Sequence, residues 1–192
     1  VKLTLLFLKD FHKRMFWMLL VLLIGVCQGA GAAPALTPVV VDKALTSLNL
    51  GAGLHYFEDT GAALSLEQIQ ALPDERWQVN RKKDFLPGYS HSAFWIKIPF
   101  QGGDDLRAMS PFMLEIDIAF MGKIDFYQWR NDTLTTHKTG LARPFAQRPL
   151  PSEIIALPME FNPGEAQTLF LRVESEGSVQ IPLMLYEREE FY

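Results

Sequence analysis

The sequence predicts an all-β fold, a sandwich or a barrel built from short strands. Apolar and polar residues alternate in several short runs, which is typical of strands with one buried face. Turn-forming sequences rich in Gly, Asn, Asp and Pro separate these runs. Beyond residue 47 only one segment has the pattern of a helix, so strands are expected to supply most of the core.

The first 32 residues have the three parts of a secretory signal peptide. Basic side chains between Lys9 and Arg14 precede an uncharged run, residues 15–26, and Ala30-Gly31-Ala32 fits the A-x-A cleavage pattern. The uncharged run is shorter than the roughly 20 apolar residues that a membrane-spanning helix needs. An uncleaved N-terminal anchor is the alternative. We therefore expect an exported protein, located in the periplasm or at the periplasmic face of the inner membrane.

Residues 33–47 are rich in Ala, Pro, Thr and Val and are predicted to form a linker, followed by one β-sandwich domain over residues 48–190. One short helix is expected within this domain, over Ser65–Leu72. Ser65 is a residue type that caps helix N-termini, and Pro73 ends the helix because it disfavours helical backbone in the residue before it. The chain has a single cysteine, which excludes an internal disulfide.

The alternating runs define the expected strands and their buried faces. These runs are residues 93–100, 112–118, 123–130, 169–173 and 179–185. The residues expected to point into the core are Phe94, Ile96, Ile98, Phe100, Phe112, Leu114, Ile116, Ile118, Ile124, Phe126, Leu169, Leu171, Val173, Val179, Ile181, Leu183 and Leu185.

The opposite faces of these strands carry large aromatic side chains. Trp95 shares its face with Lys97, and Tyr127 and Trp129 share theirs with Asp125. A solvated strand face usually carries Lys, Glu and Thr, so exposed rings here would indicate a contact. Either the rings form a platform on which a sugar stacks its apolar face, or they pack under a loop, a helix or another domain.

Composition and motifs argue against several function classes. A formal net charge of −4 makes nucleic acid a poor electrostatic partner. The histidines are scattered without metal-site spacing. Asp59-Thr60-Gly61-Ala62 matches an aspartic-protease tetrapeptide but has no second copy, so a turn is expected, and Gly88-Tyr89-Ser90-His91-Ser92 lacks the final Gly of a nucleophile elbow. We predict no catalytic residue, no metal site and no cofactor, and the chain is not expected to be an enzyme.

Five motifs that follow one another along the chain resemble a family of bacterial sensors. They are Gly88-Tyr89-Ser90 with Ser92-Ala93-Phe94-Trp95; Leu114-Glu115-Ile116-Asp117 with Ile124-Asp125-Phe126-Tyr127; the loop from Gly140 through Pro144-Phe145 to Arg148-Pro149; Pro163-Gly164-Glu165 with residues 169–175; and Ile181-Pro182-Leu183. The family is the type 2 extracellular domain of seven-transmembrane receptors with diverse intracellular signalling modules. The resemblance covers about residues 50–190.

The resemblance implies a jelly-roll β-sandwich similar to carbohydrate-binding modules, on the periplasmic side of the membrane. In that family seven membrane helices follow the domain, and then a histidine kinase, a diguanylate cyclase or a similar output module. These modules would be partners of this chain if it is a fragment of a longer receptor. A stand-alone exported sensor is the alternative.

Taken together, the residues and the resemblance lead us to expect a periplasmic ligand-sensing domain. Its ligand is expected to be a carbohydrate or another small polar molecule. The alternative is an interaction module that docks to a partner chain or forms a homodimer. Arg143 and Arg148 have planar donors that suit carboxylates or hydroxyls, unless they pair within the protein. The candidate ligand-binding residues are Trp95, Tyr127, Trp129, Arg143 and Arg148.

Overall fold

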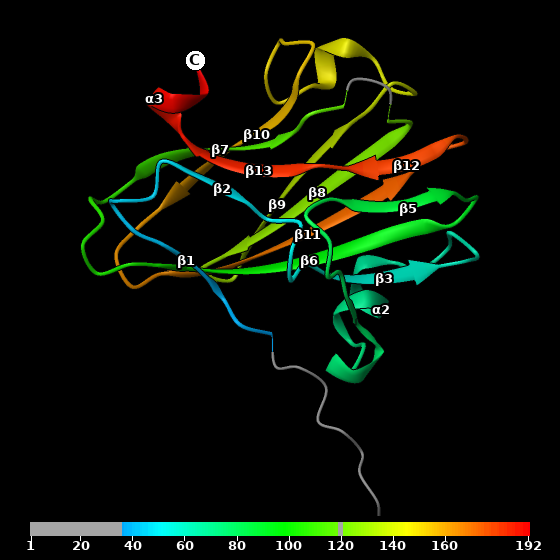
Figure 1. Ribbon diagram of the computed structural model, residues 1–192, viewed down its shortest axis with the longest axis horizontal. Coiled ribbons are helices and arrows are strands. Elements are labelled where there is room, and N and C mark those ends of the chain that lie inside the picture. Colours follow the sequence, from blue (N-terminus) through cyan, green and yellow to red (C-terminus); the bar gives the residue numbers. More distant parts are fainter. Residues whose placement is uncertain (1–35, 119–120) are drawn as a thin grey trace, which may run out of the picture. The chain divides into compact units, whose positions relative to one another are not determined.

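The computed structural model describes residues 36–118 and 121–192, which form a β-sandwich (Figure 1). The predicted signal peptide, residues 1–32, lies outside the described residues. In chain order the strands are β1 (Val39–Val41), β2 (Ser47–Asn49), β3 (His55–Asp59), β4 (Gln78–Val79), β5 (Phe85–Tyr89), β6 (Ala93–Gly102), β7 (Ser110–Ile116), β8 (Lys123–Arg130), β9 (Thr133–Thr139), β10 (Ile155–Phe161), β11 (Ala166–Glu174), β12 (Ser178–Ile181) and β13 (Leu183–Glu187).

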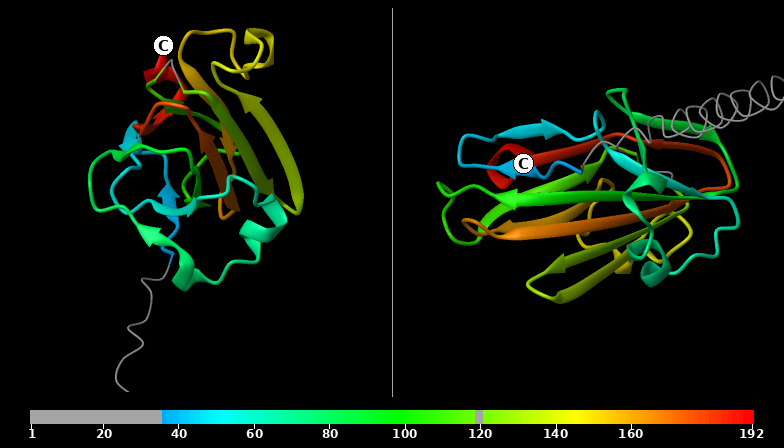
Figure 2. Two further views of the ribbon diagram at one scale, coloured as in Figure 1. Left: turned by 90° about the vertical axis from the view of Figure 1, so that its right-hand side faces the viewer. Right: turned by 90° about the horizontal axis from the view of Figure 1, so that it is seen from below.

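Two main sheets face each other across the core. The larger has seven strands in the order β4-β3-β6-β11-β8-β9, with β1 also paired to β6, and the smaller has the order β10-β7-β13-β2. Strands β12 and β5 form a separate two-stranded ribbon. From β6 to β11 the chain passes repeatedly between the two main sheets, as in a jelly roll (Figure 2). The predicted fold class, an all-β sandwich of the jelly-roll kind, is confirmed.

The core lies between the inner faces of the sheets and follows the predicted alternation. All the residues that we expected to point inward belong to one buried cluster, except Ile118, which is partly buried against it. Phe94, Ile96, Leu114 and Ile116 are examples from the two facing sheets. Burial of these alternating faces is the main stabilising contribution to such a fold.

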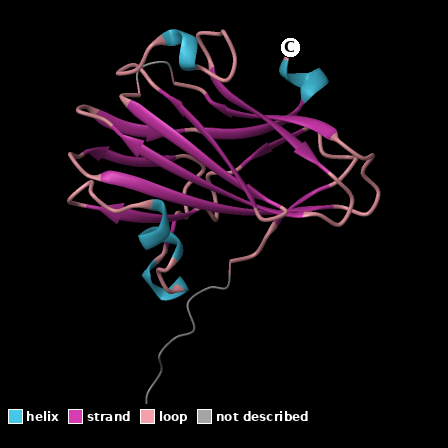
Figure 3. Ribbon diagram, turned by 180° about the vertical axis from the view of Figure 1, so that it is seen from behind, coloured by secondary structure: helices cyan, strands magenta, loops and turns pink. Residues whose placement is uncertain are grey.

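Helices lie outside the strands (Figure 3). The predicted helix is confirmed as α2 (Leu66–Gln70), where the Ser65 hydroxyl accepts from the Gln68 N–H at 3.3 Å and the Gln68 side chain accepts from the Ser65 N–H at 2.8 Å. This reciprocal capping box fixes where the helix begins. The other helical turns are η1 (Asp74–Arg76), η2 (Phe145–Gln147) and α3 (Arg188–Phe191). No helix within the described part of the chain is long and apolar enough to cross a membrane.

Two boundaries differ from the sequence-based expectations. The segment predicted as a linker, residues 33–47, contains β1, which runs parallel to β6 and places Val39 opposite Phe100. Its three consecutive valines favour a strand, and Val41 is buried in the core, so the sandwich begins earlier than predicted. The run 179–185 is also not one strand, because the chain changes sheets at Pro182, between β12 and β13.

Candidate functional site

The outer face of the seven-stranded sheet, which points away from the core, is partly covered by the segment between β3 and β4. We call residues 62–77, which include α2 and η1, the cover segment. Its Leu66, Ile69 and Trp77 form a second buried cluster with Trp95 and Phe170 of the outer face. Trp95 is only 1% exposed. Of the two alternatives for this ring, the structure therefore shows packing under a helix.

Tyr127 and Trp129 lie on the same outer face, where both are half-buried and pack against this cluster. The Tyr127 ring stacks on Trp95 with 5.8 Å between centroids and an interplanar angle of 21°. Burial raises the pKa of the Tyr127 hydroxyl, and the neighbouring Asp125 carboxylate raises it further. Tyr127 is thus a neutral side chain that extends the buried aromatic cluster toward Trp129.

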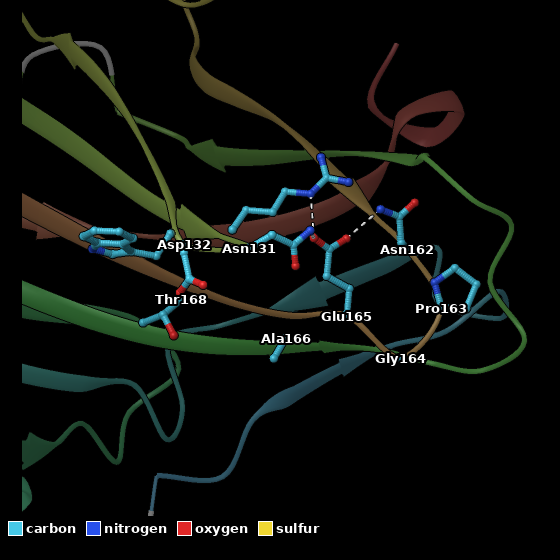
Figure 4. A pocket seen from close by; sticks show the side chains of 10 residues that line it. Asn131, Asp132, Asn162, Pro163, Gly164, Glu165, Ala166 and Thr168 are labelled. Atoms are coloured by element: carbon cyan, nitrogen blue, oxygen red, sulfur yellow. Dashed lines mark hydrogen bonds and ion pairs between the residues drawn. The ribbon is translucent and has the colours of Figure 1, made fainter.

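Trp129 forms one wall of an open pocket of about 720 Å³, which we call the Trp129 groove (Figure 4). Its other walls include Asn131, Asp132, Asn162, Glu165 and Thr168. Two turns supply them. Asn131 and Asp132 join β8 to β9 with φ values of 46° and 59°, a left-handed turn that Asn and Asp tolerate. The second turn, residues 162–165, joins β10 to β11.

Strand register brings the two turns together. β8 and β11 are antiparallel neighbours, with Trp129 opposite Thr168 and Arg130 opposite Gln167. The end of β8 therefore lies beside the start of β11. The indole and the threonine side chain share the outer face because directly opposed residues of an antiparallel pair point to the same side.

An ion pair holds the two turns of the groove together. Glu165 accepts from Arg130 Nε at 2.8 Å and from the side-chain amides of Asn131 and Asn162, both at 2.7 Å. The hydrogen bond from Arg130 is the main reason that the pKa of Glu165 lies below its ordinary value. Figure 4 shows the Glu165 carboxylate between the two asparagines. These bonds join the two turns through one carboxylate.

Two polar side chains of the groove remain free to bond a ligand or water. Within the described chain, the Asp132 carboxylate and the Thr168 hydroxyl make no hydrogen bond, and Asp132 is exposed. The Trp129 Nε1–H is buried and also has no partner among the described residues. An aromatic ring beside unbonded carboxylate and hydroxyl groups is a combination that small polar ligands can use.

Of the five residues predicted as a ligand site, Trp95, Tyr127 and Trp129 share the aromatic cluster of the outer face, whereas both arginines bond within the protein. Arg143 bonds to the Asp125 carboxylate and to the carbonyls of Ile124 and Thr139. Arg148 donates to the carbonyls of Ser152 and Glu153, and its guanidinium lies 4.8 Å from the centroid of the Phe145 ring.

Both arginines therefore hold loops in place, and Trp129 is the one member of the predicted set that lines the groove. Most of the other groove residues carry only a turn signal in the sequence, which does not indicate a ligand site. The sequence shows the turn at Asn131-Asp132 and the turn at residues 162–165, but it does not show that the two turns lie close together.

Two further expectations concern the protease-like tetrapeptide at Asp59 and the binding of a metal ion. Asp59 ends β3 and holds the turn that follows it, because its carboxylate accepts from the Leu64 N–H at 2.9 Å and its carbonyl accepts from the Ala62 N–H at 3.0 Å. This agrees with the turn predicted there. Among residues 36–118 and 121–192, no three His, Cys, Asp or Glu side chains are grouped so that they could hold a metal ion.

The fold and the groove define a β-sandwich module with an open surface site. The family model described as 7TMR-DISM extracellular 2 matches residues 51–187, and the chain belongs to this family. The family is an extracellular sensor domain of seven-transmembrane receptors, which implies a periplasmic or extracellular location and a coupling to signalling modules.

Similarity to other proteins is remote. No curated protein matches the chain. Among solved structures, the β-glucuronidase of Ruminococcus gnavus is similar with 10% identity and a TM-score of 0.42, over 79% of this chain and 29% of the enzyme. Its complex with D-glucuronic acid gives 9% identity and a TM-score of 0.41, over 79% and 31%. The chain thus spans under a third of these enzymes.

Proposed function

We propose that this domain senses a carbohydrate, bound in the Trp129 groove, on behalf of a membrane receptor. One observation carries the proposal: the half-buried Trp129 ring lines the same open site as unbonded polar groups of Asp132 and Thr168. A sugar has an apolar face that stacks on an aromatic ring and a rim of hydroxyls that need hydrogen-bond partners. The groove offers both on one side of the sheet.

The structure of the groove also supports the proposal through its rigidity. Arg130, Asn131 and Asn162 all bond to Glu165, so the two turns are fixed before any ligand arrives. A preformed site loses less conformational entropy on binding than a loose one. The same bonds occupy Glu165, which leaves Asp132 as the groove's unbonded carboxylate.

We propose that the domain binds its ligand without chemical conversion. A glycoside hydrolase needs a carboxylic acid of raised pKa beside a second carboxylate. In the groove the opposite holds for Glu165, whose pKa is lowered by the hydrogen bond from Arg130. Incubation with nitrophenyl glycosides is expected to release no nitrophenol above the rate of a Trp129→Ala control.

The test of the binding proposal is a glycan array probed with the purified chain, followed by calorimetry with the oligosaccharide that binds most strongly. Trp129→Ala should weaken that binding by about tenfold, which corresponds to an aromatic contact of about 1.4 kcal/mol. Tyr192→Ala is the matched control, because Tyr192 is an exposed ring that does not line the groove. Unchanged affinity of Trp129→Ala would show that the groove is not the site. A chain that binds no glycan would refute the carbohydrate assignment.

The alternative, an interaction module, also has one supporting observation. β9 is an edge strand of the larger sheet, and five of its seven residues are exposed. An unpaired strand edge offers backbone groups to a strand of another chain. If β9 forms a homodimer, sedimentation velocity should show a dimer for the wild type and a monomer for Thr135→Pro, while a monomeric wild type would rule it out.

A further inference from the structure

A second pocket lies at the opposite ends of the two strands that build the groove. β8 begins at Lys123 and β11 ends at Glu174, and these two residues are paired across the strands. They line a pocket of about 770 Å³ together with Tyr89, Leu141, Glu176 and Gln180. We call it the end pocket. The Trp129 groove shares no lining residue with it.

The ribbon of β5 and β12 forms one wall of the end pocket. Tyr89 is directly opposite Ser178, and both line the pocket. Val179, which follows Ser178 in β12, is buried in the core, as are Ile181 and Phe85. Alternation along β12 therefore turns the Ser178 side chain away from the core, and Tyr89 shares that side because it is directly opposite Ser178. A register shift between the Gly88 and Phe85 pairings lets Phe85 point inward on the same strand.

A tight turn that includes Leu141 and Ala142 forms another wall. The N–H groups of Leu141 and Ala142 bond to the carbonyls of Met121 and Gly122, at 2.7 Å and 2.9 Å. Gly140, with a φ of +117°, makes this close approach possible, since a Cβ there would overlap the Gly122 carbonyl. The approach leaves Leu141 66% exposed at the rim of the pocket.

Three of the sequence motifs singled out above meet at this pocket. Tyr89 and His91 come from the motif at residues 88–92, Leu141 and Ala142 from the loop that begins at Gly140, and Glu174 from the end of β11. The Tyr89 side chain belongs neither to the buried core nor to the lining of the Trp129 groove. Its ring is 87% exposed and makes no hydrogen bond or ring contact with any described residue.

The charges of the end pocket leave one carboxylate unpaired. Glu174 is held by Lys123 at 2.7 Å and by Arg172 at 2.9 Å, and the hydrogen bond from Lys123 is the main reason that its pKa is lowered. Glu176 is exposed and forms no ion pair or hydrogen bond within the described residues. Lys123 and Arg172 both engage Glu174, so Glu176 is the carboxylate of the pocket lining that no cation of the described residues pairs.

We propose that the end pocket binds a small organic cation through an alkylammonium group. The accessible face of an aromatic ring attracts such a cation through its quadrupole, and a nearby carboxylate attracts it through its charge. Tyr89 supplies the ring and Glu176 the carboxylate, while Gln180 and Ser178 offer hydrogen bonds to the rest of the ligand. This site is separate from the carbohydrate site and does not depend on it.

Choline is a suitable probe because an uncharged molecule of nearly the same shape, 3,3-dimethylbutan-1-ol, is a matched control. Titration of the full chain, followed by NMR chemical shifts, should show saturable binding of choline and at least about tenfold weaker binding of the isostere, as expected when the charge supplies the attraction. Tyr89→Ala should weaken choline binding by about tenfold, and Glu176→Gln by several fold.

Both substitutions are at exposed side chains, so thermal melting of the variants is expected to match the wild type. Trp129→Ala should bind choline normally, which distinguishes this site from the groove. The proposal is overturned if choline does not bind, if the isostere binds equally well, or if Tyr89→Ala leaves the affinity unchanged. Binding of phosphatidylcholine vesicles without binding of free choline would also overturn it.

Discussion

The guanidinium of Arg172 lies over the indole of Trp95, with 5.9 Å between its central carbon and the ring centroid. The same guanidinium donates to the Ala62 carbonyl at 2.9 Å and pairs with Glu174 at 2.9 Å. One side chain thus contacts the start of the cover segment, the buried aromatic cluster and a wall of the end pocket. Arg172 is mostly buried, with 13% of its side chain exposed, so these contacts are little screened by solvent.

Replacing Arg172 with Ala is expected to destabilise the domain by about 1–3 kcal/mol, because it leaves the Ala62 carbonyl without its donor and removes a charged hydrogen bond to Glu174. Urea unfolding monitored by tryptophan fluorescence measures this difference. Lys138→Ala is the matched control, since Lys138 is an exposed cation on edge strand β9. Equal losses for the two variants would show that the Arg172 contacts contribute nothing specific.

Trp95 and Trp129 should respond differently to truncation. Trp95→Ala removes a ring from a closed cluster and is expected to cost about 3–5 kcal/mol of unfolding free energy. Trp129 is half-buried beside an open groove, so Trp129→Ala should cost clearly less. Thermal melts of the two variants measure the contrast, and a Trp129→Ala variant as unstable as Trp95→Ala would assign Trp129 to the core.

Ile116→Ala tests the core between the sheets. Ile116 is fully buried and is paired with both Ile155 and Leu183 in the smaller sheet. The cavity left by Ala is expected to cost about 2–5 kcal/mol. Leu134→Ala, at an exposed position of β9, should change the stability by no more than about 0.5 kcal/mol in the same chemical denaturation experiment.

The Glu165 ion pair predicts a pH dependence of stability. Its folded pKa lies below the ordinary value of 4.5, so the stabilisation is fully present above that value and is lost as the pH falls through the folded pKa. The wild type should therefore lose stability between pH 5 and pH 3 more steeply than Glu165→Gln, which has no proton to take up there. Urea unfolding at a series of pH values gives both slopes, and parallel slopes would contradict the prediction.

The predicted signal peptide can be tested on the exported protein. N-terminal sequencing of the exported protein should begin at or near Ala33, after the Ala30-Gly31-Ala32 cleavage pattern. A mature protein that retains residues 15–26 would instead identify that segment as an anchor.

The sequence predicted the strands that have one apolar and one polar face. The run 123–130 coincides with β8, because Ile124 and Phe126 alternate with polar residues. β9 gave no such signal, since an edge strand with five exposed residues has almost no apolar face. β10 was missed as well. Pro158 interrupts its apolar pattern, and the proline is accommodated because β10 is the edge of its sheet.

The candidate sites were less predictable than the fold for a related reason. The sequence identified Trp129 as an outward-facing ring, but the groove depends on the pairing of Trp129 with Thr168 and on two turns that are distant in the chain. Arg143 and Arg148 resembled ligand donors because of their residue type alone. Their carbonyl partners belong to the backbone, which a side-chain pattern does not reveal.

The pairing of β2 with β13 has a consequence for how the domain folds. Leu48 is opposite Leu185, so one edge of the smaller sheet joins the two extremes of the domain. A contact of such long sequence separation forms late, because the loop between its partners must close first. Nascent chain crossing a membrane from its N-terminus therefore cannot complete this sheet until β13 has emerged. Until then it remains open to the proteases and chaperones of the compartment that receives it.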